Sequence, residues 1–180
     1  MVSSMSIPYV LTVDNHLDSI LNYVDGFHAS SSFSASTLPF AAEAAWSTGK
    51  WDQLERMLTS ASEKEANSSL DFNVGVGRAM LALRQGQVDE FKNMITTLRE
   101  AVAKSLSPTS TASLHACHDH LVKLHALYEI EAISGMTVEN LPERAAILTN
   151  LDQRLDILGS YISDKQYLLG IRRAAMQLSQ

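Results

Sequence analysis

The sequence predicts an all-α protein made of antiparallel helix pairs, and three observations carry this prediction. Apolar residues recur at three- and four-residue spacing along nearly the whole chain. No segment shows sustained alternation of apolar and polar residues, so we expect no sheet. A stretch that begins at Gly49 recurs at Gly86, 37 residues later. We therefore expect a helical-hairpin repeat solenoid of the tetratricopeptide or HEAT type, a right-handed stack of antiparallel helix pairs that fills residues 1–180 as a single segment.

The first third of the chain contains several residues that favour the start or the end of a helix. Residues 1–13 are expected to form an irregular end, and Asp14 can cap the first helix. The Ser-rich stretch 28–36 is predicted to be a loop. Pro39 favours the start of an Ala-rich helix, and a further helix begins at Trp51.

The remaining segments continue the helical period. Asp71 is expected to cap a helix, and Val88 begins the next one. Residues 105–113, with a central proline, read as a turn. A long helix follows, with an expected core stripe of Leu114, Cys117, Leu121, Leu124 and Tyr128. Two more helices carry stripes of Ala146, Leu148, Leu151, Leu155 and Leu158, and of Tyr167, Leu168, Ile171, Ala175 and Leu178.

The internal repeat aligns Gly49–Leu58 with Gly86–Ile95 without a gap. Apolar residues share positions in the pairs Trp51 and Val88, Leu54 and Phe91, and Leu58 and Ile95. Each glycine can supply a tight turn between helices, because glycine accepts positive φ. The apolar residue after the turn is expected to fill the gap between the paired helices. The alternative is two unrelated amphipathic helices of similar composition.

Composition and charge exclude several classes of function. The 180 residues are 46% hydrophobic and 19% charged, which is enough for a sizeable core. With 14 Lys and Arg against 20 Asp and Glu, the net charge of −6 does not favour a broad nucleic-acid-binding face, although it allows a local basic patch. The one cysteine excludes an internal disulfide. No secretory signal or apolar run of roughly 20 residues is present, so we expect a soluble protein of a reducing compartment.

A cluster of potential metal ligands lies on the long helix. It comprises His115, Cys117, His118, His120 and His125. On one helix these side chains fan around the axis, whereas a metal needs three or four ligands that converge. We therefore expect partly exposed histidines beside a core stripe, with Cys117 as a small core residue.

Two glycines, Gly75 and Gly77, resemble part of a dinucleotide-binding loop. Met80 stands where the third glycine of that motif would be, and no strand precedes the segment. The glycines are expected to allow two helices to approach closely. No Ser-His-Asp, GxSxG, Walker A or HExxH pattern occurs either. We therefore expect no catalytic residue, no cofactor and no metal site in this chain.

Aromatic and basic residues near helix ends are weaker indications of a binding surface. Trp46 and Trp51 flank the Gly49 turn and are expected to wedge two helices together in the core. Arg172 and Arg173 could pair with an acid of a partner, but a solvated helix end is the expected arrangement.

Four stretches, in order, resemble the FAT region of phosphatidylinositol-3-kinase-related protein kinases. They are AAEAAWSTGKWDQLERML at 41–58, DFNVGVGRAMLALRQGQVDEFKNMITTLREAVAKSLS at 71–107, LHACHDHLVKLHALYEIEAI at 114–133 and LDQRLDILGSYISDKQYLLGIRRAAMQL at 151–178. The resemblance covers most of residues 8–178. It is strongest to the ATR-type checkpoint branch and, within that branch, to fungal members.

The resemblance implies stacked helical hairpins that wrap the kinase domain of a very large nuclear protein. That family phosphorylates Ser or Thr followed by Gln, with ATP and a divalent metal, in response to DNA damage. Its ATR-type members work with an obligate accessory subunit. The kinase motifs are absent here, so we expect a non-catalytic scaffold whose partners are proteins, namely the rest of the kinase and the accessory checkpoint subunit. We expect no direct nucleic acid, membrane or small-molecule partner.

Two alternatives stand beside the scaffold. One is a free-standing tetratricopeptide-like adaptor that binds a protein or peptide partner in a concave groove. Such a groove needs a ladder of polar or basic side chains, and the sequence offers only the scattered Lys50, Arg56, Arg78, Arg84 and Lys92. The other is a metal-dependent enzyme built on the segment from His115 to His125.

Overall fold

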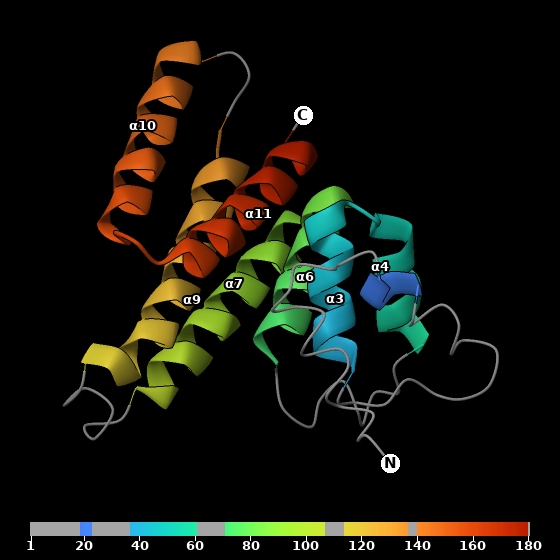
Figure 1. The fold of residues 1–180 in the computed structure, drawn as a ribbon. Coiled ribbons are helices and arrows are strands. Elements are labelled where there is room, and N and C mark those ends of the chain that lie inside the picture. The colour runs from blue at the N-terminus through green and yellow to red at the C-terminus, as the bar shows by residue number, and fades with distance from the viewer. Residues whose placement is uncertain (1–18, 23–36, 61–70, 107–113, 137–139, 180) are drawn as a thin grey trace. The chain divides into compact units, whose positions relative to one another are not determined.

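The computed structural model describes residues 19–22, 37–60, 71–106, 114–136 and 140–179, and these are helical except for turns and short connections (Figure 1). The helices are α3 (Leu38–Thr48), α4 (Trp51–Ser60), α6 (Phe72–Arg84), α7 (Val88–Ser105), α9 (Leu114–Ser134), α10 (Leu141–Ile157) and α11 (Ile162–Leu178). The described ranges contain no strand, and the predicted all-α class is confirmed. The expected irregular end at 1–13 and loop at 28–36 lie outside them.

The helices fall into two compact units, a division that the sequence did not predict. Unit 1 spans Met1–Met94 and unit 2 spans Ile95–Gln180, so that the boundary lies within α7. Each unit is described by itself below.

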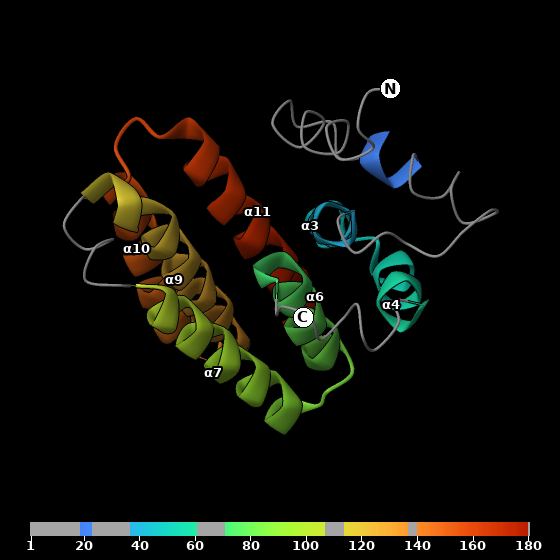
Figure 2. The ribbon, with the colours of Figure 1, turned by 90° about the horizontal axis from the view of Figure 1, so that it is seen from below.

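Unit 1 is built around the alanine-rich helix α3. Ala41, Ala42, Ala44 and Ala45 are all buried, and their small side chains let α4 and α6 pack closely on α3 (Figures 1 and 2). Pro39 lies in the first turn of α3, where its missing N–H is not needed. The same helix ends at Gly49, as predicted.

Asp71 caps the start of α6, as predicted. Asp71 has extended backbone and precedes the first helical residue. Its Oδ1 accepts hydrogen bonds from the backbone N–H of Asn73 at 2.9 Å and of Val74 at 3.2 Å. These are backbone donors of the first turn that have no partner within the helix, so the carboxylate caps α6.

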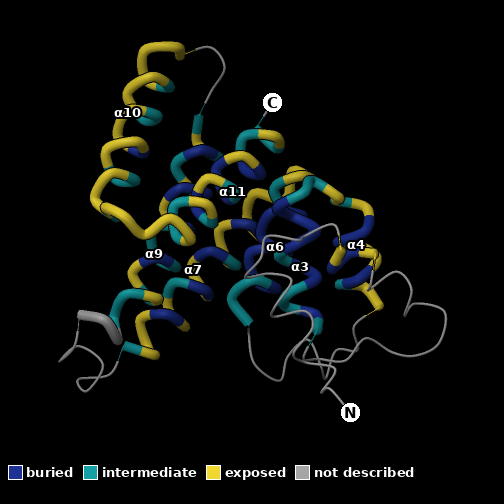
Figure 3. Tube along the Cα trace, viewed as in Figure 1, coloured by how far each residue is buried: buried dark blue, intermediate teal, exposed yellow. Residues whose placement is uncertain are grey.

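Unit 2 is dominated by the packing of α9 against α11, and α10 contacts α9 less extensively. Figure 3 shows buried segments where α9 meets α11, whereas α10 is exposed along most of its length. The carboxyl-terminal half of α7 adds buried Ile95, Leu98 and Val102 to this unit. Arg99 of that half forms an ion pair with Glu131 of α9 at 2.8 Å.

The core stripe predicted for α9 is wrong. Leu121 and Tyr128 are 42% and 37% exposed, and Cys117 is only partly buried. The buried apolar residues are instead Val122, Ala126, Leu127, Ile130 and Ile133. Apolar side chains occupy most of the circumference of α9, so their spacing alone does not single out one face. The packing of α11 selects the buried one.

Candidate functional site

The two glycines of the repeat form equivalent turns. Gly49 has φ of 73° and Gly86 has φ of 71°, the left-handed conformation that glycine adopts without strain. The N–H of Gly49 donates to the carbonyl of Trp46 at 3.3 Å, and the N–H of Lys50 donates to that of Ala45 at 2.9 Å. At Gly86 the same pair of bonds recurs with every residue shifted by 37, at 3.1 and 2.9 Å. Both are Schellman turns, so the repeat extends to backbone hydrogen bonds.

The side chains of the repeat are less uniform than its turns. Leu54, Phe91 and Ile95 are buried, whereas Trp51 and Leu58 are only partly so. Val88 is 52% exposed, so the expectation that the residue after the turn fills the gap between helices is wrong for Val88. Phe91, one turn later on α7, is the buried apolar residue instead. At the first turn Trp46, which precedes the glycine, is the fully buried tryptophan.

The glycine pair in α6 serves helix packing. Gly75 and Gly77 are buried within the helix, which is no geometry for a phosphate-binding loop. A Cβ added at Gly77 would lie 3.2 Å from Cδ1 of Leu54 on α4. The expected close approach of two helices is therefore present at this residue.

A groove of about 330 Å³ lies in unit 1 between α4, α6 and the start of α7. Its apolar lining includes Leu58, Leu81 and Met94, and its charged lining includes Glu55 and Arg78. Gln85 donates from Nε2 to Oε1 of Glu55 at 3.0 Å across one edge. Acidic and basic groups are mixed along this lining, whereas the adaptor hypothesis requires a row of polar or basic side chains that face the groove.

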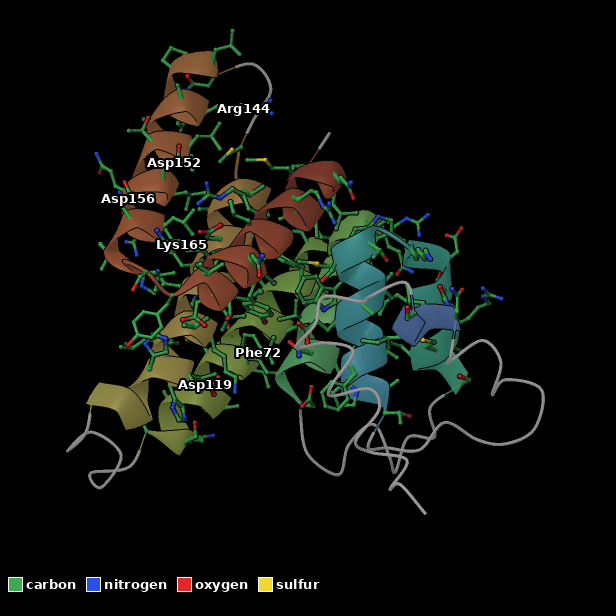
Figure 4. All side chains as sticks on the ribbon, viewed as in Figure 1. Phe72, Asp119, Arg144, Asp152, Asp156 and Lys165 are labelled. Atoms are coloured by element: carbon green, nitrogen blue, oxygen red, sulfur yellow. The ribbon has the colours of Figure 1, made fainter. Side chains whose placement is uncertain are left out.

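Unit 2 contains a buried ionic cluster that the sequence did not predict. Arg172 of α11 donates from Nε and Nη2 to the two carboxylate oxygens of Glu129 on α9, at 3.0 and 3.1 Å. Its Nη1 donates to Oδ1 of Asp152 on α10 at 2.6 Å. These three residues, here called the Arg172 cluster, join all three helices of the carboxyl-terminal part of the unit. Figure 4 labels Asp152 on α10.

The electrostatics of the Arg172 cluster are asymmetric. The side chains of Arg172 and Glu129 are 9% and 1% exposed, whereas that of Asp152 is 70% exposed. Hydrogen bonds to Glu129 raise the pKa of the Arg172 guanidinium above its ordinary value, and burial opposes them. The expectation of a solvated helix end is wrong for Arg172, because its guanidinium is buried against the carboxylate of Glu129, a partner 43 residues away in the chain. Spacing along α11 could not have identified it.

The histidines of α9 do not converge. Nε2 of His118 lies 2.6 Å from Oδ2 of Asp164 on α11, and the ring of Tyr161 lies 4.6 Å from the His118 ring. Nδ1 atoms of His120 and His125 are buried without a hydrogen-bond partner. Among the residues placed by the structure, no three His, Cys, Asp or Glu side chains are grouped to hold a metal ion. His118 is instead part of the contact between α9 and α11.

The pKa values of two further side chains, Glu43 and His125, are shifted by their surroundings. Burial, reinforced by Asp71, raises the pKa of Glu43 in unit 1 from 4.5 to about 7. Oε2 of this side chain accepts a hydrogen bond from Nδ2 of Asn73 at 2.9 Å. Burial and the charge of Arg154 lower the pKa of His125 in unit 2, and Glu129 opposes that shift. Both groups therefore favour their neutral form in the folded chain.

None of the helices in the described ranges combines the length and the apolarity that crossing a membrane requires. The described part of the chain contains three kinds of contact or turn between helices: glycine turns, close helix packing and the Arg172 cluster.

Comparison with known proteins agrees with this picture. Residues 38–180 match the model of the FAT domain family, and the match includes every described helix from α3 to α11. No solved structure matches the chain.

The curated proteins include one similar serine/threonine-protein kinase, TOR, from Arabidopsis thaliana. It is 26% identical over 153 residues, which cover 74% of this chain and 6% of that kinase. The chain therefore spans a small part of the length of the relative that it matches.

Proposed function

Because the chain belongs to the FAT domain family of phosphatidylinositol-3-kinase-related kinases, we propose that it acts as a non-catalytic helical scaffold segment of such a serine/threonine kinase. The observation that carries the proposal is the family match over residues 38–180, on a chain whose described residues form helices joined by tight turns. In this role the segment supports and regulates a kinase domain that lies outside the chain. Its partners are then proteins, first of all the remainder of the kinase.

The scaffold role is mechanical. In a helical repeat, each hairpin contacts its neighbours, so that a change at one end passes along the array through adjacent contacts. The equivalent Schellman turns at Gly49 and Gly86 support such a repeat, because they end two helices, α3 and α6, with the same backbone hydrogen bonds. A segment of this kind could carry the effect of a bound partner to a distant catalytic domain.

Within the family, we propose the ATR-type DNA-damage checkpoint branch, in the nucleus and with the accessory checkpoint subunit as a further partner. The four stretches between residues 41 and 178 that resemble this branch support the assignment, since they occur in order and at fitting spacing. A TOR-type kinase is the second candidate, which the similarity to the plant TOR kinase favours.

The experiment that tests the scaffold role is to read the native transcript through this segment. A reading frame that continues into a kinase domain supports the proposal. A reading frame without any kinase domain contradicts it and favours a free helical-repeat protein that binds a peptide.

The branch is tested in cells that express the native protein with residues 71–106, the α6–α7 pair, deleted. After a block to DNA replication, the ATR-type assignment predicts loss of phosphorylation at Ser or Thr followed by Gln, at an unchanged level of the protein. Phosphorylation that persists unchanged contradicts the ATR-type assignment and leaves the TOR-type candidate. Undeleted protein expressed from the same promoter is the control.

A further inference from the structure

Helix α10 is attached to unit 2 by few contacts. Of its residues from Leu141 to Ile157, only Leu151 is buried. Figure 3 shows the contrast with the buried segments of α9 and α11. The apolar contact of α10 includes the buried Leu151, packed with Ile133 and Ala175, and the partly buried Ile147.

The polar attachments of α10 are equally few among the described residues. Asp152 accepts the 2.6 Å hydrogen bond from Arg172. Asn150 accepts a hydrogen bond from the Tyr128 hydroxyl at 3.4 Å, and the guanidinium of Arg154 lies 3.9 Å from the centre of the Tyr128 ring. Only the first of these ties α10 to a buried group.

Breaking the contact of Arg172 with Asp152 leaves no buried charge unpaired. Arg172 keeps both hydrogen bonds to Glu129, so the buried guanidinium stays neutralised. Asp152, already 70% exposed, is solvated by water. This differs from an ordinary buried ion pair, in which loss of one partner leaves a charge uncompensated.

Helices α9 and α11 also contact each other at places that do not involve α10. At one end, Asp164 and Tyr161 contact His118. Along the length, buried residues of α11, among them Leu168 and Ile171, belong to the interface with α9. Gly159 lies between α10 and α11 with φ of 57°, and no atom lies within 4 Å of the place of a Cβ, so nothing packs against this position of the connection.

From these contacts we infer that α10 is a releasable helix, held on a stable α9–α11 pair chiefly by Asp152 and Leu151. Release uncovers an apolar strip that includes Ile133, Ala175 and the partly buried Met136 and Met176, with Arg172 beside it. The inference concerns unit 2 alone and does not depend on the branch of the kinase family.

The test is hydrogen exchange, measured helix by helix on the full 180-residue chain. The substitution Asp152→Asn removes the charged acceptor of Arg172, and Asp156→Asn removes the same charge one turn along α10, where Figure 4 labels it. We expect Asp152→Asn to speed exchange in α10 by roughly tenfold, as fits the loss of a hydrogen bond between charged groups, with α9 and α11 unchanged. The control variant, Asp156→Asn, should leave the exchange rates of α10 unchanged.

Two outcomes would overturn the inference: no change in α10 with Asp152→Asn, or equal acceleration in α9, α10 and α11. A second measurement needs no substitution. Added salt weakens an ion pair that has an exposed partner, so exchange of α10 in the unmodified chain should rise with salt. In the Asp152→Asn variant this dependence should largely vanish, and its persistence would contradict the role of Asp152.

Discussion

Arg172 is the residue on which the charge balance of the unit 2 core depends. The substitution Arg172→Ala leaves the Glu129 carboxylate, only 1% exposed, without its cation. We expect the free energy of unfolding to fall by about 3–5 kcal/mol, because a buried charge is then uncompensated. Urea denaturation followed by circular dichroism measures this loss.

A double substitution separates two contributions to the free energy of unfolding. One is the cost of leaving a buried charge unpaired, and the other is the net contribution of the Arg172–Glu129 ion pair. Replacing both Arg172 and Glu129 by methionine removes both buried charges and keeps apolar volume in their place. Such replacements of buried ion pairs are often neutral or stabilising, so the double variant should be more stable than Arg172→Ala. Equal or lower stability would mean that the pair itself holds unit 2 together.

Two glycines with open surroundings should respond to alanine with opposite signs. Gly86 has φ of +71° and Gly170 lies within α11, and neither has an atom within 4 Å of an added Cβ. Gly86→Ala should lower the free energy of unfolding by about 1–2 kcal/mol, through backbone strain alone. Gly170→Ala should raise it by up to about 1 kcal/mol, since alanine favours helix. Thermal melts of the two variants against the unmodified chain check both signs, and a neutral Gly86→Ala would argue against the Schellman turn.

At the scale of elements, the ends of helices were predictable because their causes are local. Asp71 caps α6 with its own carboxylate, and Gly49 ends α3 by adopting positive φ. The face that a helix buries has a different origin. On α9 it depends on where α11 lies, and the buried carboxylate of Glu129 is explained only by Arg172 from a helix far along the chain. A single sequence holds no direct signal for such a pairing.

On α7, the finding that Phe91 rather than Val88 fills the gap between helices can be checked by substitution. Phe91 is buried, whereas Val88, one turn earlier on α7, is 52% exposed. Phe91→Ala should therefore lower the free energy of unfolding by about 3–5 kcal/mol. Val88→Ala should change it by less than about 0.5 kcal/mol. Equal losses in chemical denaturation would restore the original expectation that Val88 fills the gap between helices.

At the scale of the whole molecule, the two units should respond to pH in opposite directions. In unit 1 the pKa of Glu43 is raised from 4.5 to about 7, so the folded form binds the proton more tightly than the unfolded form does. Its contribution to stability is then greatest at low pH and is lost as the pH rises from 4.5 to about 7, by roughly 3 kcal/mol. In unit 2 the pKa of His125 is lowered, so protonation favours the unfolded form. Its contribution is full above pH 6.5 and is lost as the pH falls below that value.

Hydrogen exchange of each unit across this pH range, corrected for the intrinsic rates, separates the two contributions. Between pH 7 and pH 5, α3 and α6 should gain protection and α9 should lose it. Glu43→Gln should flatten the response of unit 1 alone, and His125→Gln that of unit 2 alone, because each removes one titrating group from one unit. Parallel responses in both units, or a substitution that alters both, would show that groups other than Glu43 and His125 control the acid stability of the scaffold.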